Sequence, residues 1–419
     1  MPSWYFPRIA SRIAALALLA AVAACGRGPT VPAPVVSGQS EARPPSAAPL
    51  GKVSTEKLTA PNPAANAVKV ALLLPLSGPN ADLGKSMLDA AQLALFTMGG
   101  EHLTLVPRDT GGTPDGAAKA ARSAVDEKVG LILGPLLAAE VEAVKPIAAA
   151  ANINVIAFST ATQLAGGNVF LMGFLPHDEA VREVGFAREK GAQRFAALLP
   201  NSPYGHLMAD ALREAAAATG ATVGRVEYID PRMPDTSMAV KHVLGISGGV
   251  AGPGAGAGAP NIDALLLPEG GPQLKQLADQ LQAAGLDAAK VRLLGSGLWD
   301  DPSIASDTAL YGGWFASSPP DARHDFQTRY EAAYHHPPPR LASLAFDSAA
   351  LAAVLSKSGG DNPFSRDAVL NPSGFSGVDG LFRFTQAGLV QRGLAVIEIG
   401  PTGDTVVSPA PSSFTTPGM

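Results

Sequence analysis

Residues 68–98, VKVALLLPLSGPNADLGKSMLDAAQLALFTM, contain two different hydrophobic periodicities in succession. The first seven residues are apolar apart from one lysine, which predicts a strand buried on both faces of a sheet. Leu83, Met87, Ala91 and Leu95 then recur at helical spacing, which predicts a helix with one apolar face. A buried strand followed by an amphipathic helix predicts the start of a βαβ unit.

The same alternation continues along most of the chain. Further strand-like runs lie at 102–110, 129–135, 153–159, 194–200, 221–229, 262–270 and 290–297. Helical runs separate them at 114–128, 138–152, 204–220, 236–246 and 272–285, and two more follow at 321–336 and 341–359. The pattern predicts an α/β protein with two Rossmann-like lobes built on parallel sheets.

The last strand-like runs differ from the others because only a short turn separates them. GLFRFTQAGLVQRGLAVIEIG, residues 380–400, has two alternating runs around Gln386-Ala387-Gly388 and predicts a β-hairpin. A hairpin is unusual in a purely doubly wound sheet. It therefore indicates that the chain crosses between the two lobes more than once.

The first residues have the features of an export signal. Arg8 and Arg12 precede an uncharged apolar run, 13–24, that ends in small residues. This run is shorter than the roughly 20 residues that span a bilayer, so we expect a signal peptide over 1–24. Val22 to Cys25 resembles a bacterial lipobox, which implies that Cys25, the single cysteine of the 419 residues, is lipidated.

Residues 25–67 are rich in Pro, Ser and Ala and predict a disordered tether between the lipid and the folded part. The expected location is the periplasm of a Gram-negative envelope, with a membrane as partner through the lipid anchor. Gly26 follows the cysteine, where lipoproteins retained at the inner membrane often carry aspartate. This favours the outer membrane.

Composition and motifs argue against several classes of function. The net charge is −5, charged residues make up 16% of the chain, and lysines and arginines are scattered, so nucleic acid is not an expected partner. Gly78 to Ser86, GPNADLGKS, has five residues between the first glycine and Gly-Lys, where a P-loop has four. No metal-ligand spacing or nucleophile–base pair stands out. We therefore expect no enzyme activity, no metal and no cofactor.

The loops that follow the strands carry hydroxyl groups. Ligands of open α/β sheets bind beyond the carboxyl ends of the strands. Ser77 follows the strand-like run that begins at residue 68, and Ser159 and Thr160 follow the run at 153–159. The sequence thus predicts a small-molecule pocket that recognises its ligand by hydrogen bonds.

Four segments carry a resemblance to a known family. Residues 72–95, 109–121, 130–162 and 201–221 resemble, in this order, successive blocks of the type I periplasmic-binding-protein fold in its leucine/isoleucine/valine-binding branch. The resemblance implies two lobes joined by a three-segment hinge, with crossovers near Phe174, Gly297 and Gly374. It assigns 68–174 and 298–374 to the first lobe, 175–297 and 375–400 to the second, and 401–419 to a C-terminal tail.

The same resemblance implies how a ligand is held. Ala161 and Thr162 match the pair that binds an amino acid after the fourth strand, and Tyr204 matches the tyrosine of the second lobe. Glu269 or Asp300 would supply the acid that holds the amino group. The serine expected after the third strand is missing, because Gly134 to Ala139 reads GPLLAA.

Two functions stay open at this point. The leucine/isoleucine/valine-binding branch implies a receptor that binds an amino-acid-like solute in the cleft and delivers it to an ABC permease. A second branch of the same fold, lipoproteins that activate penicillin-binding proteins, is similar in its anchor and tether. Members of that branch act through protein contact in peptidoglycan synthesis.

Overall fold

The computed structural model describes residues 48–49, 67–230, 232–233, 235–246, 261–357 and 362–414. The predicted signal peptide, the lipidation site Cys25 and nearly all of the predicted tether lie outside these ranges. Within them, no helix has both the length and the apolar character needed to cross a bilayer.

Five of the described strands form a parallel sheet in the order β3-β2-β4-β5-β6. They are β2 (Val68–Leu74), β3 (Leu103–Asp109), β4 (Leu131–Leu133), β5 (Asn154–Ala157) and β6 (Val169–Leu171). In β2, Val70, Leu72 and Leu74 join one hydrophobic core, while Ala71 and Leu73 join another. Successive side chains of a strand point to opposite faces, and both faces of this sheet are covered, which is why the run is continuously apolar.

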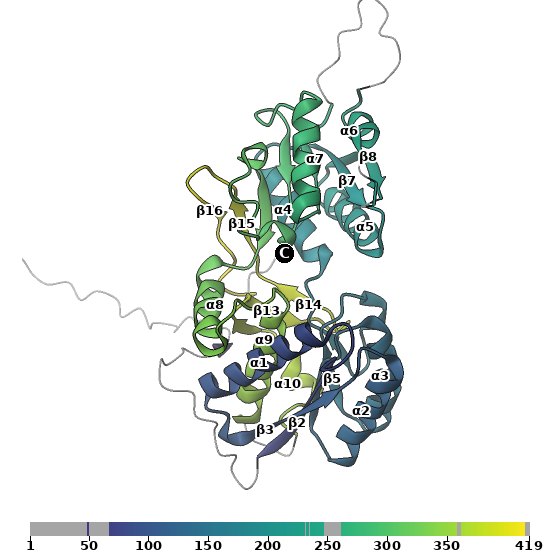
Figure 1. Ribbon diagram of the computed structural model, residues 1–419, viewed down its shortest axis with the longest axis vertical. Coiled ribbons are helices and arrows are strands. Elements are labelled where there is room, and N and C mark those ends of the chain that lie inside the picture. Colours follow the sequence, from purple (N-terminus) through teal and green to yellow (C-terminus); the bar gives the residue numbers. More distant parts are fainter. Residues whose placement is uncertain are drawn as a thin grey trace, which may run out of the picture. The chain divides into compact units, whose positions relative to one another are not determined.

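Helices cover both faces of this sheet. The core on one face includes α1 (Ala81–Met98) and α9 (Ala342–Lys357), which pack against each other although 243 residues lie between the end of α1 and the start of α9 (Figure 1). The other face is covered by α2 (Pro114–Asp126) and α3 (Ala138–Ala150). The 3₁₀ turns η1 (Gly100–His102) and η2 (Thr162–Leu164) and the short helix α10 (Arg366–Val369) complete this lobe.

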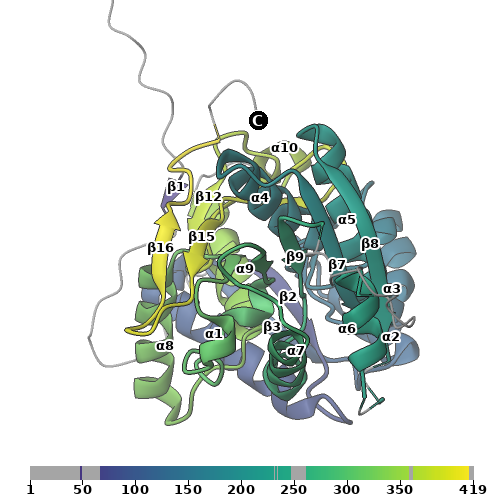
Figure 2. The same cartoon turned by 90° about the horizontal axis from the view of Figure 1, so that it is seen from above.

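Seven of the described strands form the second sheet, in the order β16-β15-β11-β10-β9-β7-β8. Strands β7 (Arg194–Pro200), β8 (Thr222–Ile229), β9 (Ala264–Leu266), β10 (Arg292–Leu294) and β11 (Trp314–Ser317) are parallel. Strands β15 (Ala395–Glu398) and β16 (Thr405–Ser408) extend it antiparallel. Seen from above, β16 and β8 lie at its two edges (Figure 2).

This sheet is also covered on both faces. Phe195, Ala197 and Leu199 of β7 share a core with α4 (Pro176–Glu189) and α5 (Pro203–Ala218). Ala196 and Leu198 point to the core of α6 (Ser237–Val243) and α7 (Gly271–Ala283). The turns η3 (Gly297–Trp299) and η4 (Thr308–Leu310) lie on the chain between β10 and β11.

A small sheet, β1-β12-β13-β14, contains the predicted hairpin. Strands β13 (Gly380–Phe384) and β14 (Val390–Arg392) pair antiparallel, as the alternating runs predict, and β12 (Phe375–Gly377) pairs with β13. β1 (Ala48–Pro49), from the predicted tether, pairs with β12. Phe375, Phe382 and Phe384 join the core that contains α1 and α9.

The lobe boundaries differ from the prediction. β11 belongs to the seven-stranded sheet, so residues 298–317 lie in the second lobe instead of the first. Strands β12 to β14 pack on the core of the first lobe, so 375–392 belong there, while α8 (Pro320–Tyr334) packs on α1. The described chain therefore crosses between the lobes near Phe174, as predicted, and near Ser318 and Gly393 instead of Gly297 and Gly374.

The predicted C-terminal tail also differs, because β16 within it pairs with β15 in the second sheet. Its main chain continues the sheet by hydrogen bonds, although the side chains of β16 are largely exposed. The fold thus uses residues up to at least Ser408.

Two glycines bring helices close to the strands before them. A Cβ on Gly84 of α1 would lie 2.1 Å from the carbonyl oxygen of Pro75, and one on Gly205 of α5 would lie 1.9 Å from that of Pro200. Neither distance is possible between real atoms, so glycine is required at both places. The first turns of α1 and α5 are thereby held against the carboxyl ends of β2 and β7.

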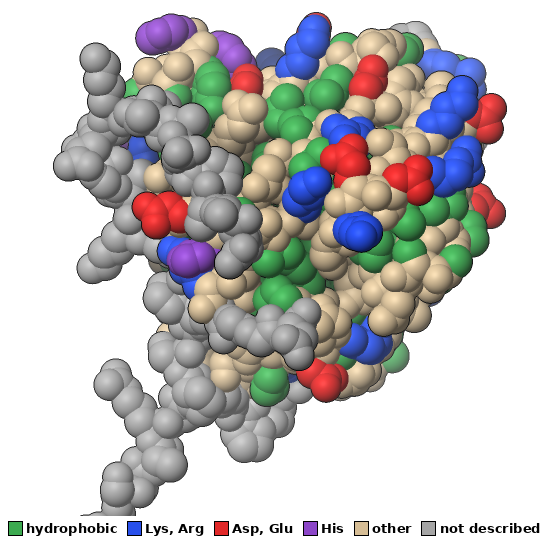
Figure 3. All heavy atoms as spheres, turned by 90° about the horizontal axis from the view of Figure 1, so that it is seen from below, with side chains coloured by type: hydrophobic (Ala, Val, Ile, Leu, Met, Phe, Trp, Pro, Cys, Tyr) green, Lys and Arg blue, Asp and Glu red, His purple; other side chains and the backbone are tan. Residues whose placement is uncertain are grey.

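On one face of the molecule, positive and negative side chains are mixed. Figure 3 shows one face on which lysines and arginines alternate with acidic side chains. That face presents no large field of one sign, which electrostatic recognition of a polyanion requires.

Candidate functional site

A cavity of about 890 Å³ lies between the carboxyl ends of the two sheets. The first lobe contributes the loop after β4, the loop after β5 and the segment before α9. The second contributes the first turns of α4 and α5, η3 and the end of β11. Strand ends of both lobes meet there, as expected for ligand sites of open α/β sheets.

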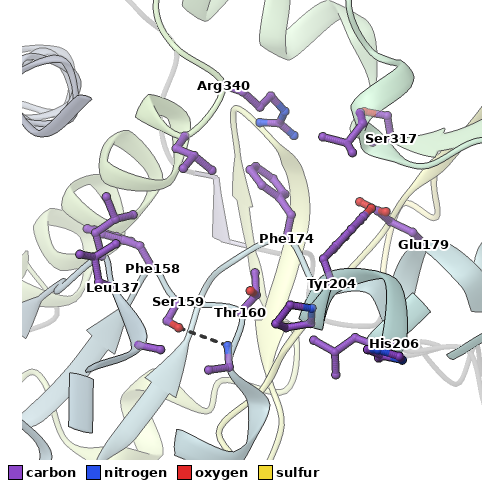
Figure 4. Close-up of a pocket in the computed structure, with 18 of the residues that line it drawn as sticks. Leu137, Phe158, Ser159, Thr160, Phe174, Glu179, Tyr204, His206, Ser317 and Arg340 are labelled. Atoms are coloured by element: carbon purple, nitrogen blue, oxygen red, sulfur yellow. Dashed lines mark hydrogen bonds between the residues drawn. The ribbon is translucent and has the colours of Figure 1, made fainter. Parts of the chain in front are cut away.

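Four of the eight residues predicted to bind ligand line this cavity. They are Ser159, Thr160 and Ala161 on the first lobe and Tyr204 on the second (Figure 4). Tyr204 reaches it because Pro203 and Tyr204 form the first turn of α5, which Gly205 holds against β7. The other four predicted residues do not line it.

Asp300 lies just beyond the cavity wall. Its Oδ2 accepts a hydrogen bond from Ser317 Oγ (2.7 Å) and pairs with Arg323. Ser317 itself lines the cavity, so Asp300 supports a lining residue instead of offering a free carboxylate. The prediction of Asp300 as the acid of the cavity is therefore corrected.

Glu269, Thr162 and Ser77 also lie outside the lining. Glu269 is half-buried, its Oε1 has no hydrogen-bond partner among the described residues, and burial raises its pKa to about 6. Thr162 begins the η2 turn behind Ala161. Ser77 is exposed in the turn after β2, where its backbone N–H donates to Asp109 Oδ1 (3.1 Å).

The loop after β5 presents hydroxyl groups to the cavity. Ser159 is buried, and its Oγ accepts a hydrogen bond from the backbone N–H of Ala161 (3.2 Å), drawn dashed in Figure 4. A hydroxyl that accepts one bond still has its own proton to donate. Ser159 can therefore donate to a ligand oxygen, with the exposed hydroxyl of Thr160 beside it.

The loop after β4 is apolar, as its sequence suggests. Leu136 and Leu137 line the cavity, and the backbone N–H of Leu137 is already bound to Glu140 Oε2 (3.1 Å). Phe158, Leu83 and Leu341 extend this apolar wall. One side of the cavity is thus suited to a hydrocarbon or aromatic group.

Glu179 of α4 is a buried acid that lines the cavity, and the sequence analysis missed it. Glu179 is only 9% exposed, and this burial raises the pKa of its carboxyl to about 7. A backbone hydrogen bond from Gly297 and the charge of Arg340 act in the opposite direction, because both favour the ionised form. The spacing of Glu179 and Glu183, one helical turn apart, is the signal that would have shown two acids on one helix face.

Glu183 and Tyr204 surround Glu179. Burial, helped by the charge of Glu179, raises the pKa of Glu183 well above its usual value, and Glu183 Oε1 accepts a bond from the backbone N–H of Ala316 (2.8 Å). Burial likewise raises the pKa of Tyr204, so its phenol keeps its proton at neutral pH. At this end of the cavity, protonated carboxyl and phenol groups can donate hydrogen bonds to a solute. A cationic group of the solute would favour the ionised form of Glu179.

Arg340 lies across the cavity on the first lobe, just before α9, and was also missed. Its Nη1 donates to Asp379 Oδ1 (2.9 Å) and to Ser343 Oγ (3.0 Å). The guanidinium carbon lies 3.7 Å from the centroid of the Phe174 ring, which also lines the cavity. The cavity therefore has an apolar wall, a hydroxyl-bearing loop, one guanidinium, the buried acid Glu179 and the exposed acid Asp210.

The groups that line the cavity are suited to binding a solute. Among the described residues, no group of three histidines, cysteines or acids is placed to hold a metal ion. Three hydroxyls of the described lining are buried: Ser159 Oγ accepts from the backbone N–H of Ala161, Ser317 Oγ donates to Asp300, and Ser318 Oγ donates to Asp379. The arrangement can bind and orient a solute.

A protein family and several solved structures are similar to this chain. A family model described as periplasmic binding protein matches residues 67–404. A Rhodospirillum rubrum structure assigned to a branched-chain amino acid ABC transporter is 20% identical with a TM-score of 0.70, covering 81% of this chain and all of that one.

Two ligand complexes have the same fold. A Streptococcus pneumoniae branched-chain amino acid substrate-binding protein, in complex with isoleucine, is 20% identical with a TM-score of 0.57 and covers 82% of this chain and 100% of its own. A Rhodopseudomonas palustris solute-binding protein, in complex with benzoate, is 19% identical with a TM-score of 0.58 and covers 82% and 97%.

A curated relative matches a shorter part of the chain. It is an uncharacterised protein of Rickettsia prowazekii, 23% identical over 176 residues, or 42% of this chain. The match spans about half of that relative's length, 47%.

Proposed function

The chain belongs to the periplasmic binding protein family, and on that basis we propose that it is a non-catalytic receptor for a small amino-acid-like solute. The observation that carries the proposal is the cavity of about 890 Å³ lined by both lobes. A pocket of this size suits a small organic molecule. Family membership also implies an extracytoplasmic location.

The arrangement of groups supports an amino-acid-like solute. Ser159 and Thr160 offer donors for a carboxylate on the first lobe, and Glu179 offers an acceptor for an ammonium group on the second. A solute that contacts both lobes binds most tightly to the conformation in which both lobes reach it. Binding therefore stabilises that conformation. Binding proteins of this kind deliver the solute to a permease, which we propose as the partner.

Thermal denaturation with a panel of solutes tests this proposal. The panel contains leucine, isoleucine, phenylalanine and benzoate, with mannitol as a neutral control. A solute at 100 times its dissociation constant stabilises the folded form by about 2.7 kcal/mol. We expect at least one acid to raise the melting temperature and mannitol to leave it unchanged. If no acid raises it, the receptor proposal fails.

Activation of a penicillin-binding protein is a second candidate function. It is favoured by the loop after β4, where Leu136 and Leu137 replace the hydroxyl that the amino-acid-binding branch uses. This function would depend on a protein surface instead of the cavity. In-cell crosslinking of the chain to a transpeptidase, with no melting response to any solute, would support it, and absence of the crosslink would eliminate it.

We also propose that Cys25 carries a lipid that anchors the protein to the outer membrane. The support is the run of small residues Val22-Ala23-Ala24 directly before the cysteine. A single acyl chain gives only reversible membrane binding, and stable anchoring requires more than one. The wild type is expected in the membrane fraction. The Cys25→Ser variant is expected either in the soluble fraction or as unprocessed precursor. Unchanged partition with a processed N-terminus would contradict lipidation.

A further inference from the structure

We propose that Arg340 is the anion-binding residue of the cavity and pairs with the carboxylate of the bound solute. The inference rests on the proposed receptor function and adds the identity of the group that selects the solute. Arg340 would supply the contact for which the loop after β4 has no hydroxyl. The solute class is a monocarboxylate with an apolar or aromatic body.

The guanidinium of Arg340 is held in place by three contacts. Asp379 and Ser343 both accept from Nη1, and the ring of Phe174 lies beneath the guanidinium plane (Figure 4). Both hydrogen bonds found among the described residues use Nη1, which leaves the donors on Nε and Nη2. The side chain remains 27% exposed where it lines the cavity. A fixed fork with free donors suits a carboxylate.

A second guanidinium lies close to Arg340. Arg392 also lies beside Phe174, 4.9 Å from the ring centroid, and its Nε and Nη1 have no hydrogen-bond partner among the described residues. Arg340 and Arg392 share the Asp379 carboxylate, whose pKa they lower against the effect of burial. Asp178 adds a second carboxylate beside Arg392, so the unpaired guanidinium donors, and not an excess of charge, are what suits an anion here.

Three further charged side chains lie near Arg340 and Asp379. Asp347 lies beside Asp379, and burial together with the charge of Asp379 raises its pKa to about 7, so it is only partly ionised at neutral pH. Burial, and then repulsion by Arg340, lowers the pKa of Arg323 to about 10. Asp300 already pairs with Arg323. Asp347 and Asp300 therefore add little negative charge beside Arg340.

The rest of the cavity defines the solute body. Leu137 and Phe158 lie on the same lobe as Arg340 and favour an apolar group. Glu179 lies on the second lobe, and a second carboxylate placed near it would be repelled when Glu179 is ionised. The cavity thus favours one anionic group over two.

Matched acids and amides test the assignment. The probes are benzoate with benzamide and leucine with leucinamide, titrated by calorimetry into the intact chain. The wild type is expected to bind each acid at least tenfold more tightly than its amide. The Arg340→Gln/Asp379→Asn double variant removes the ion pair and leaves Arg392 with the charges of Asp347 and Asp178, and we expect it to lose this preference.

Controls separate anion binding from a structural role. Arg232→Gln is expected to keep the preference for acids, because its side chain is 89% exposed and does not line the cavity. If the double variant does not fold, Arg340→Lys serves instead, because it keeps the charge but loses the fork. It is expected to bind acids more weakly and still prefer them to amides.

Two contrary outcomes are distinguishable. A preference for acids that survives in the double variant overturns the role of Arg340 while leaving the receptor function in place. A wild type that binds none of the four compounds overturns this assignment, and with an unresponsive melting panel it overturns the receptor function too.

Discussion

Replacing Asp379 with alanine is expected to lower the free energy of unfolding by about 3–5 kcal/mol, the range for breaking a buried ion pair. Asp379 is fully buried and accepts from Arg340 Nη1 at 2.9 Å, and Ser318 Oγ lies 3.4 Å from the same oxygen. Removing it leaves the nearby guanidiniums of Arg340 and Arg392 without their shared counter-ion. Because Ser318 and Arg392 lie at two of the crossovers, the loss would fall on the hinge.

Urea denaturation of the variant and the wild type measures this loss. Asp325→Ala on α8 is the matched control, because Asp325 is exposed and its replacement is expected to change the free energy of unfolding by no more than about 0.5 kcal/mol. Equal midpoints for Asp379→Ala and the wild type would show that the ion pair does not stabilise the hinge.

Replacing Glu179 with glutamine is expected to stabilise the protein increasingly as the pH rises. The pKa of the Glu179 carboxyl is raised by burial from 4.5 to about 7, so the folded protein binds a proton that the unfolded chain releases between these values. The stability of the wild type therefore falls, relative to the variant, as the pH rises from about 4.5 to about 7. The difference amounts to about 3 kcal/mol.

Thermal or urea denaturation at pH 4.5 and pH 8 measures this difference. Glu142→Gln on α3 is the control, because Glu142 is exposed and its replacement is expected to have the same small effect at both pH values. If the variant exceeds the wild type in free energy of unfolding by the same amount at both pH values, then folding does not raise the pKa of Glu179. An ammonium-bearing solute should reduce the advantage, because it favours the ionised carboxylate.

Much of the fold was predictable from local patterns. The apolar runs at 68–74 and 194–200 become the parallel strands β2 and β7, because both faces of each sheet are covered and each side chain needs an apolar partner. The hairpin around Gln386-Ala387-Gly388 was predictable for a similar reason, since its alternation is local.

The assignment of late segments to lobes was not predictable in this way. The run that becomes β11 is apolar and would fit either sheet, and only its pairing with β10 and β15 decides between them. Phe375, Phe382 and Phe384 likewise pack on the first core through contacts distant in sequence. A pattern of apolar residues predicts a strand but does not identify its neighbours.

The site was predictable only in part, for the same physical reason. Ser159, Thr160, Ala161 and Tyr204 follow strands, and the strand-end rule locates them correctly on the cavity wall. Glu179 begins a helix, and Arg340 follows three prolines in a loop, so neither lies directly after a strand. They reach the cavity because α4 and the segment before α9 meet there, which depends on tertiary packing.

Calorimetric titration of the intact chain, wild type and Thr160→Trp, tests the central claim that the interlobe cavity binds a solute. Thr160 is exposed and lines the cavity, so an indole there fills the binding space without entering the core. With the acid that raises the melting temperature most, we predict one site per wild-type chain and at least tenfold weaker binding by the variant. Equal affinity of the two proteins would show that the solute binds elsewhere and would contradict the account.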